Sequence, residues 1–347
     1  MEQGWLAIRH PDSLITALHD RAMNWNSRRS RGLIYQALLV GMLLCMLAWL
    51  LTNTLSNMQA RGIRSGFDFL GDNAGFDIGE SLLAYDASQP YWKAFVVGLL
   101  NTLRVSLLGM VGCTLLGTLI GVGRLSHNAL ARGLCYTYTE LFRNIPLLLQ
   151  LFMWYVLLVE WMPDSETPLH WADLAFLSKS GLTLPWLSSA DGVWRWDVPV
   201  WQNGNVTGGA SLSPEFVALT WGLTLYTAAF VAEVVRAGLL SVPRGQIEAA
   251  HSIGLSPALT LRLVVLPQAM RLIVPPMTNQ YLNLIKNSSL AVAIGYPDLV
   301  NISNTALNQT GRAVECIALV MAVYLTLSLL TAAAMNAYNR RVATRMR

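Results

Sequence analysis

Charged side chains are scarce in this chain of 347 residues: only 13% are Asp, Glu, Lys or Arg, whereas 54% are hydrophobic. A soluble globule of this length needs more polar surface to cover its apolar core. The composition therefore excludes an ordinary soluble domain and indicates an integral membrane protein.

Motifs for nucleotides and metals are also missing. The phosphate-binding motif G-x-x-x-x-G-K-[ST] does not occur, and none of the three lysines follows a glycine-rich turn between a strand and a helix. The four cysteines show no CxxC or Cys/His spacing, which predicts packing roles without a metal or a disulfide. We therefore expect a chain that is not an enzyme and carries no cofactor. These lysines and cysteines are Lys93, Lys179, Lys286, Cys45, Cys113, Cys135 and Cys316.

Long apolar runs are abundant, and a bilayer is crossed by about 20 such residues. Six runs at 33–52, 94–122, 145–161, 215–240, 266–294 and 314–338 predict an all-α membrane protein with both termini on one side. The expected divisions are an N-terminal arm at 1–32, an extra span at 33–52, an outer segment at 53–93, a core at 94–338 and a tail at 339–347. The core contains an outer loop at 162–213 and an inner loop at 241–265.

Basic residues predict which side is cytoplasmic. On this map sixteen of them lie on the side of the termini and of the 241–265 loop, and six lie on the other side. By the positive-inside rule, both termini and that loop are expected in the cytoplasm. The net charge of +4 follows this distribution, so it requires no nucleic acid. The first run also begins too far from Met1 for an ordinary cleaved signal peptide.

The inner loop contains a compact motif that starts at Glu248, Ala249 and Ala250. The alanines keep one face of a short helix narrow, so that another protein can approach its backbone, and Glu248 suits the start of a helix. Gly254 can adopt the left-handed conformation that ends a helix, and Ser256 with Pro257 predicts the start of a second one.

This spacing, followed by Val264, Leu266 and Pro267, resembles the EAA loop of ABC-importer permeases, in which Ile is usual where Val264 stands. The resemblance implies a type I importer core whose loop contacts a separate ATPase. The residues expected to make that coupling contact are Arg244, Gln246, Glu248, Ala249, Ala250 and Gly254.

Two further segments resemble the permeases for polar amino acids. In Glu140–Leu151, Arg143 and Pro146 are expected to be structural anchors at the start of a core helix. In the segment Ala232–Gly238, Glu233 and Arg236 can pair across one helical turn, and Phe230 replaces a Tyr common in the family. Pro267 is also assigned a structural role.

Residues 61–78 narrow the resemblance to the Q-type permeases of general L-amino-acid importers, through segments such as Ser65-Gly66-Phe67 and Ala74-Gly75-Phe76-Asp77-Ile78. The resemblance implies a bacterial inner membrane and broad or polar and acidic amino-acid specificity. It also implies an ATPase dimer that binds ATP and Mg, a second permease that is a paralogue, and a periplasmic binding protein. Transport would follow alternating access, with lipid around the spans.

A zwitterionic amino acid in a pore is served by amides and hydroxyls, and polar groups in a span indicate function by default. Interhelical hydrogen bonds are an equally good explanation for these residues. Asn287 stands where relatives with basic substrates often have Asp. For Arg104, an ion pair with a neighbouring subunit or snorkelling is favoured over contact with a substrate carboxylate. The candidate pathway residues are Thr224, Thr227, Gln280, Asn283, Lys286, Asn287, Ser288, Ser289 and Arg104.

The outer loop at 162–213 is rich in tryptophan, including Trp171, Trp186, Trp194, Trp196 and Trp201. An aromatic belt at the membrane interface is the simpler interpretation, and a docking surface for the binding protein is the alternative.

Two other classes of protein remain open. An ion-coupled secondary transporter would show acidic residues in mid-span and often an inverted repeat, neither of which is evident. A membrane receptor or scaffold would leave the EAA spacing unexplained.

Overall fold

The computed structural model describes residues 28–60, 62, 65–172, 174–190, 193–202 and 205–344. The chain divides into two units, residues 1–65 and 66–347. In the first unit, α2 (Arg28–Ala60) is one long helix whose apolar side chains are mostly exposed, and its hydropathy is that of a membrane span. Most of the predicted arm at 1–32 lies outside the described residues, as does the end of the tail.

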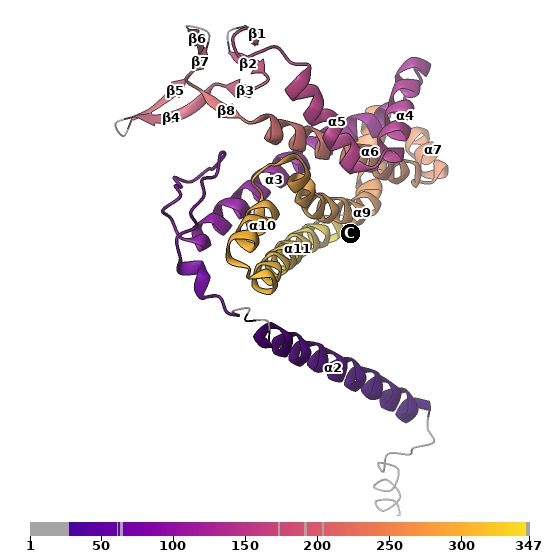
Figure 1. Cartoon of the computed structure of the whole chain (residues 1–347). Helices are drawn as coiled ribbons and strands as arrows, with labels where there is room; N and C mark the ends of the chain where they lie inside the picture. Colours follow the sequence, from indigo (N-terminus) through magenta and orange to yellow (C-terminus); the bar gives the residue numbers. More distant parts are fainter. Residues whose placement is uncertain are drawn as a thin grey trace, which may run out of the picture. The chain divides into compact units, whose positions relative to one another are not determined.

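The second unit is a bundle of long apolar helices (Figure 1). Its span-length segments are α3 (Tyr91–Gly123), α6 (Pro214–Leu240), α11 (Ala313–Thr344), and α9 (Leu266–Asn287) with its short neighbouring helices. Among the described residues, five helical segments are long and apolar enough to cross a membrane, or six if one bent pair counts. The prediction of a helical multi-pass membrane protein is confirmed.

The bent pair differs from the straight span expected at 145–161. It consists of α4 (Ala129–Asn144) and α5 (Leu147–Glu160), whose axes are bent by 106°. Ile145 between them is extended, at φ −96° and ψ 128°, because the ring of Pro146 disfavours the helical conformation in the preceding residue. The helix in the apolar run at 145–161 is therefore α5, which has only 14 residues, and α4 runs in another direction.

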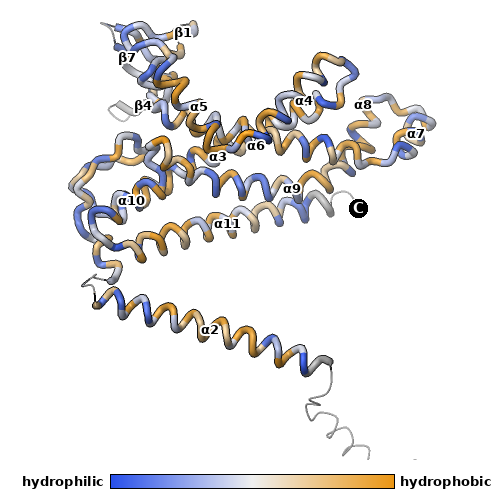
Figure 2. Tube along the Cα trace, turned by 45° about the vertical axis from the view of Figure 1, so that its right-hand side comes forward, coloured by the Kyte–Doolittle hydropathy of each residue, from blue (hydrophilic) through white to orange (hydrophobic). Residues whose placement is uncertain are grey.

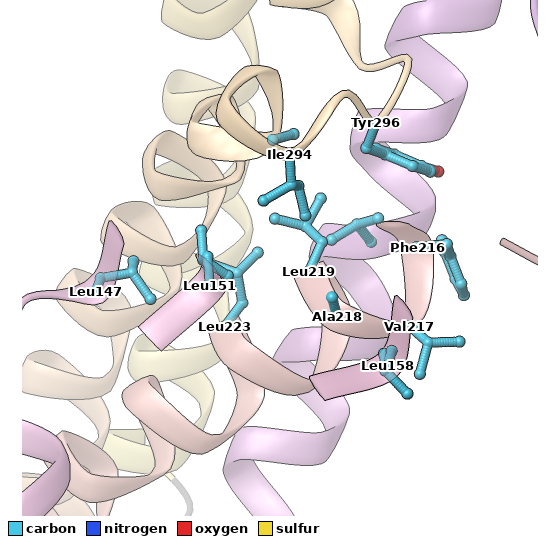
Figure 3. Close-up of a cluster of buried hydrophobic side chains, with 12 residues drawn as sticks. Leu147, Leu151, Leu158, Phe216, Val217, Ala218, Leu219, Leu223, Ile294 and Tyr296 are labelled. Carbon is cyan, nitrogen blue, oxygen red and sulfur yellow. The ribbon is translucent and has the colours of Figure 1, made fainter. Parts of the chain in front are cut away.

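Close packing of α3 on α6 forms the centre of the unit. Cβ atoms added to Gly117 and Gly121 would lie 2.5 Å from Val231 and 2.7 Å from Ala232, so only glycine permits this approach. Beside it, leucines of α5 interlock with the first half of α6, and Ile294 and Tyr296 cover them (Figure 3). These contacts make α3, α5 and α6 the rigid frame of the bundle.

The outer loop contains strands that the sequence did not predict. One sheet has the order β1-β2-β3-β8, and two hairpins, β4-β5 and β6-β7, extend from it, all with antiparallel pairing. The strands are β1 (Leu169–Trp171), β2 (Ala175–Ser178), β3 (Gly181–Leu184), β4 (Trp186–Ala190), β5 (Val193–Asp197), β6 (Val200–Gln202), β7 (Asn205–Thr207) and β8 (Ala210–Leu212). Trp171 and Trp196 are 84% and 69% exposed, so several indoles of this insertion are uncovered in the single chain.

Residues 66–90, which include the short helix η1 (Asp68–Gly71), pack on the bundle instead of forming a free loop. Arg312, one residue before α11, donates to the Gly66 carbonyl and to Asp68 Oδ2, both at 3.0 Å. The Gly66 amide donates to Glu315 Oε1 at 2.7 Å. This segment is therefore fastened to the start of α11.

Helix α10 (Leu299–Thr310) begins after a buried turn and precedes α11. Asp298 caps it by accepting from the Asn301 amide at 2.9 Å, and the Tyr324 hydroxyl lies 3.5 Å from its other carboxylate oxygen. Burial raises the pKa of Asp298, which lies in the loop outside the candidate spans, to about 7.

Candidate coupling segment and polar face

Helix α7 (Arg244–Ser252) displays the motif on the surface of the chain. Glu248 and Ala249 are exposed, and Ala250 is buried, with Ile247 packed on the neighbouring apolar cluster. Arg244 and Gln246 are also exposed. The helix therefore presents a face of small and polar side chains and is held by its opposite side.

The turn after α7 has the predicted conformation. Gly254 adopts φ +83°, and the amides of Gly254 and Leu255 donate to the carbonyls of His251 and Ala250 at 3.0 and 3.1 Å. This pair of bonds is the Schellman pattern that ends a helix at a left-handed glycine. The predicted cap is present as well, since Ser256 Oγ accepts from the Leu259 amide with Pro257 in the first turn.

From this turn the chain runs into α9 without a break. The short helix α8 (Pro257–Thr260) is followed by one π-helical turn, η2 (Leu261–Val265), and then by α9. Pro267 is the second residue of α9, and its missing N–H removes one hydrogen bond from the helix directly after the π-helical turn. The Gln268 amide donates to Gln246 Oε1 and, at 3.0 Å, to the Val264 carbonyl. These contacts join α7 to the start of α9.

A stripe of polar side chains runs along the exposed side of α9. Asn279, Asn283 and Lys286 are exposed and lie on one helical face, spaced i, i+4 and i+7, and hydrophilic positions are visible along α9 in Figure 2. Lys286 and Ser289 also line a groove of about 510 Å³ with Tyr324 and Ser328 of α11. Polar groups in a span avoid lipid, so this stripe requires a polar neighbour or a water-filled space.

The other predicted pathway residues lie beside the stripe or in α6. Ser288 and Ser289 begin the 3₁₀ helix η3 (Ser288–Ile294), and their hydroxyls donate to the carbonyls of Ile285 and Lys286 in the last turn of α9. Thr224 lies against Gly112 of α3, and Thr227 is buried in α6. Gln280 and Asn287 are half-buried beside the stripe. The structure therefore places Asn283 and Lys286 on the exposed side of α9, with Gln280 and Asn287 beside them, whereas Thr224 lies against α3 and Thr227 is buried.

Arg104 is paired inside its own chain, whereas the sequence had suggested an ion pair with a neighbouring subunit or snorkelling. Its Nη1 lies 2.6 Å from Glu80 Oε1, and its guanidinium lies 4.2 Å from the centre of the Phe216 ring. The second oxygen of Glu80 accepts from the Ser213 hydroxyl at 2.5 Å. Because Glu80 neutralises the arginine, Arg104 is a clamp between the 66–90 segment, α3 and the start of α6.

The expected structural anchors form two groups. Arg236 Nε donates to Glu233 at 3.1 Å, which confirms the predicted pair, and Arg124 of α3 adds a second ion pair to the same carboxylate at 2.5 Å. Pro146 produces the bend before α5, and the Arg143 guanidinium lies 5.5 Å from the centre of the Phe230 ring. Phe230 thus contacts the Arg143 cation through its ring, and this contact does not need the hydroxyl of the Tyr that is common in the family.

Sequence analysis missed Glu80, Asp68 and Arg312. Each makes a contact with a residue more than 20 positions away, and no local spacing signals such pairs. Of the three, only Asp68 lies in the segment 61–78, whose resemblance to one subgroup of permeases was noted from the sequence.

Comparison with known proteins decides the family. Residues 113–346 match the family described as the binding-protein-dependent transport system inner membrane component. The chain belongs to this family. Its match covers α6, α7 and α9, so the exposed α7 and the polar stripe are parts of a permease domain.

Relatives match along nearly the whole chain. A protein of Escherichia coli named YhdX, described as an amino-acid ABC transporter permease, is 43% identical over 90% of this chain and 94% of its own. The general L-amino acid transport system permease protein AapQ of Rhizobium johnstonii is 38% identical over 94% and 97%. The crystal structure of an amino acid ABC transporter with histidines matches 72% of this chain and 95% of its own, at 25% identity and a TM-score of 0.54.

Proposed function

We propose that this chain is the permease subunit of an ATP-driven importer of L-amino acids, with α7 as the helix on which a separate ATPase dimer acts. The proposal rests on one observation: the turn at Gly254 joins the exposed α7 to one helical segment, α8, η2 and α9, that carries the polar stripe. The names of the relatives support an amino acid as the substrate.

The direction of force follows from this connection. When the ATPase subunits close, they displace α7, and the Schellman turn and the Gln246–Gln268 contact carry the displacement into α9. The polar stripe then changes its access from one side of the membrane to the other. Both termini and α7 lie in the cytoplasm, in accordance with the excess of basic residues there.

The polar side chains of the α9 stripe also indicate what lies next to this helix in the complex. Among the residues that the structure describes, Asn283 and Lys286 have no polar side-chain partner, so a second permease, a paralogue, faces them and the amino acid passes between the two subunits. Amides and a single cation fit the carboxylate and the ammonium of a broad range of neutral, polar and acidic amino acids. A periplasmic binding protein delivers the substrate.

The test is uptake of radiolabelled amino acids into proteoliposomes that contain the full complex. Uptake is expected to require ATP on the side of the membrane where the ATPase subunits lie. It should vanish when the ATPase subunits are omitted. Uptake that persists without the ATPase and follows a proton or sodium gradient would establish the alternative, a secondary transporter. A complex with normal ATP hydrolysis and no uptake of any amino acid would refute the substrate class alone.

A further inference from the structure

Three arginine side chains line one recess beside α4. Helix α4 lies at the same end of the bundle as α7 (Figures 1 and 2). The recess has a volume of about 490 Å³. One wall is a single face of α4, whose residues are spaced i, i+3, i+4 and i+7, and the other walls belong to the ends of α3 and α6. The lining residues are Arg124, Leu125, Ala129, Arg132, Gly133, Tyr136 and Arg236.

The recess carries an excess of positive charge. Arg124 and Arg236 share one carboxylate, Glu233, and among the described residues the Arg132 side chain donates to a neutral group, the Ser126 carbonyl at 3.3 Å. Three guanidinium groups against one carboxylate leave a local charge of +2, and none of the seven lining residues is acidic. Such a site favours an anion.

The shape favours a phosphate group. The guanidinium of Arg124 lies 5.3 Å from the centre of the Tyr136 ring, which fixes its plane along one wall. Planar arginine forks match the oxygens of phosphate in a bidentate manner. On the other wall, Ala129 and Gly133 leave space, since a Cβ added to Gly133 would meet no atom within 4 Å.

The surface beside the recess is apolar. Leu130, Leu134 and Leu141 of α4 are 71%, 64% and 53% exposed and occupy the helical face next to the arginine-lined one. A ligand with a phosphate head and hydrocarbon chains would satisfy both surfaces at once. Basic pockets between membrane helices on the cytoplasmic side bind anionic headgroups in this way.

We infer that this recess binds the phosphate of an anionic phospholipid, whose chains lie on the leucines of α4. The bound headgroup neutralises the excess charge and holds α4 against the ends of α3 and α6. This site is distinct from α7 and from the α9 stripe, so it goes beyond the transport function.

The test measures lipid binding by native mass spectrometry of the purified full complex. We expect phosphatidylglycerol to bind at least tenfold more tightly than phosphatidylethanolamine. Arg132→Gln, at an exposed position, is expected to weaken phosphatidylglycerol binding about tenfold, and Gly133→Glu, which places a carboxylate in the recess, is expected to do the same. The matched controls are Arg262→Gln, which removes an exposed arginine from η2, and Gly133→Ala, and both are expected to bind within twofold of the wild type.

Inorganic phosphate distinguishes the source of the anion. Displacement of phosphatidylglycerol by millimolar phosphate, with the same dependence on Arg132, would support the phosphate chemistry and make the free ion the ligand. Equal binding of phosphatidylglycerol by the wild type, Arg132→Gln and Gly133→Glu would overturn the proposal. Loss of the ATPase from the Arg132→Gln complex with lipid binding unchanged would also overturn it and identify the recess as a protein contact.

Discussion

At one end of the bundle, α7 exposes Glu248 and Ala249 and is shaped by contacts between near neighbours, such as the Schellman turn at Gly254. At the end that carries the β-strands, Glu80 and Arg312 are instead paired with groups far away in the sequence. The first end is left open, as a surface for another subunit would be, whereas the second is closed by its own chain. Mutations should therefore affect function at the first end and stability at the second.

The largest effect is expected at the closed end. Glu80→Ala leaves the Arg104 guanidinium, whose side chain is 19% exposed, without its carboxylate. Loss of one partner of a largely buried ion pair costs about 3 kcal/mol in the free energy of unfolding. Thermal unfolding of the complex in detergent measures this loss of stability. The double variant Glu80→Ala with Arg104→Met should lose less stability than the sum of the losses in the two single variants. Equal stability of Glu80→Ala and wild type would contradict the clamp.

At the open end we expect loss of transport with little loss of stability. Gly254→Pro forces φ to about −65° where the turn requires a positive value, so α7 loses its fixed attachment. ATP-driven uptake should fall about a hundredfold, or about 2.7 kcal/mol, while membrane insertion is retained. Gly254→Asn, which tolerates the left-handed conformation, is the control. Normal uptake by Gly254→Pro would show that this turn is not part of the coupling.

A pH effect is expected from the buried cap of α10. The pKa of Asp298 is raised from 3.8 to about 7 in the folded protein, so the folded state retains a proton that the unfolded state releases. Its contribution to stability is fully present below the ordinary pKa and is lost as pH rises through 7. The free energy of unfolding should fall by about 3 kcal/mol between pH 5 and pH 8 through this group. Asp298→Asn retains a capping acceptor, and its melting temperature should depend less on pH; an unchanged dependence would refute the assignment.

A smaller functional effect is expected on the polar stripe. Lys286→Met removes the cation of the stripe but keeps the length of the side chain, so uptake should fall about tenfold, or about 1.4 kcal/mol, mainly through a higher KM. ATP hydrolysis and the melting temperature should change little, because Lys286 is exposed in this chain. A decrease in stability with unchanged KM would assign Lys286 to helix packing.

The smallest effect is expected at an exposed ion pair in the outer insertion. Lys179 lies 2.9 Å from Asp164, and the two side chains are 39% and 75% exposed. Lys179→Ala should therefore change the free energy of unfolding by less than about 1 kcal/mol. It is the matched lysine control for Lys286→Met, and uptake should be normal. A large loss of uptake would show that charge in the insertion contributes to transport.

The same contrast explains what could be predicted from the sequence. The spans, the cap at Ser256, the left-handed Gly254 and the Glu233–Arg236 pair depend on residues within a few positions, so composition and spacing revealed them. Short strands joined by tight turns lack a long periodic signal, and the insertion at 162–213 was interpreted as a loop. The partner of Arg104 was missed because its contact with Glu80 depends on the tertiary fold. For Thr224 and Thr227, residue type suggested a pore, but only the tertiary packing shows that Thr224 lies against α3 and that Thr227 is buried.

The most direct test of the account is site-specific cross-linking in the assembled complex. A photoreactive cross-linker on a cysteine introduced at Ala249 is compared with one introduced at Trp171, in a chain with its native cysteines replaced. The account predicts that position 249 cross-links to the ATPase subunit, more strongly when ATP is bound, and that position 171 does not. Cross-links to the ATPase from position 171, or none from position 249, would contradict the assignment of α7 as the coupling helix.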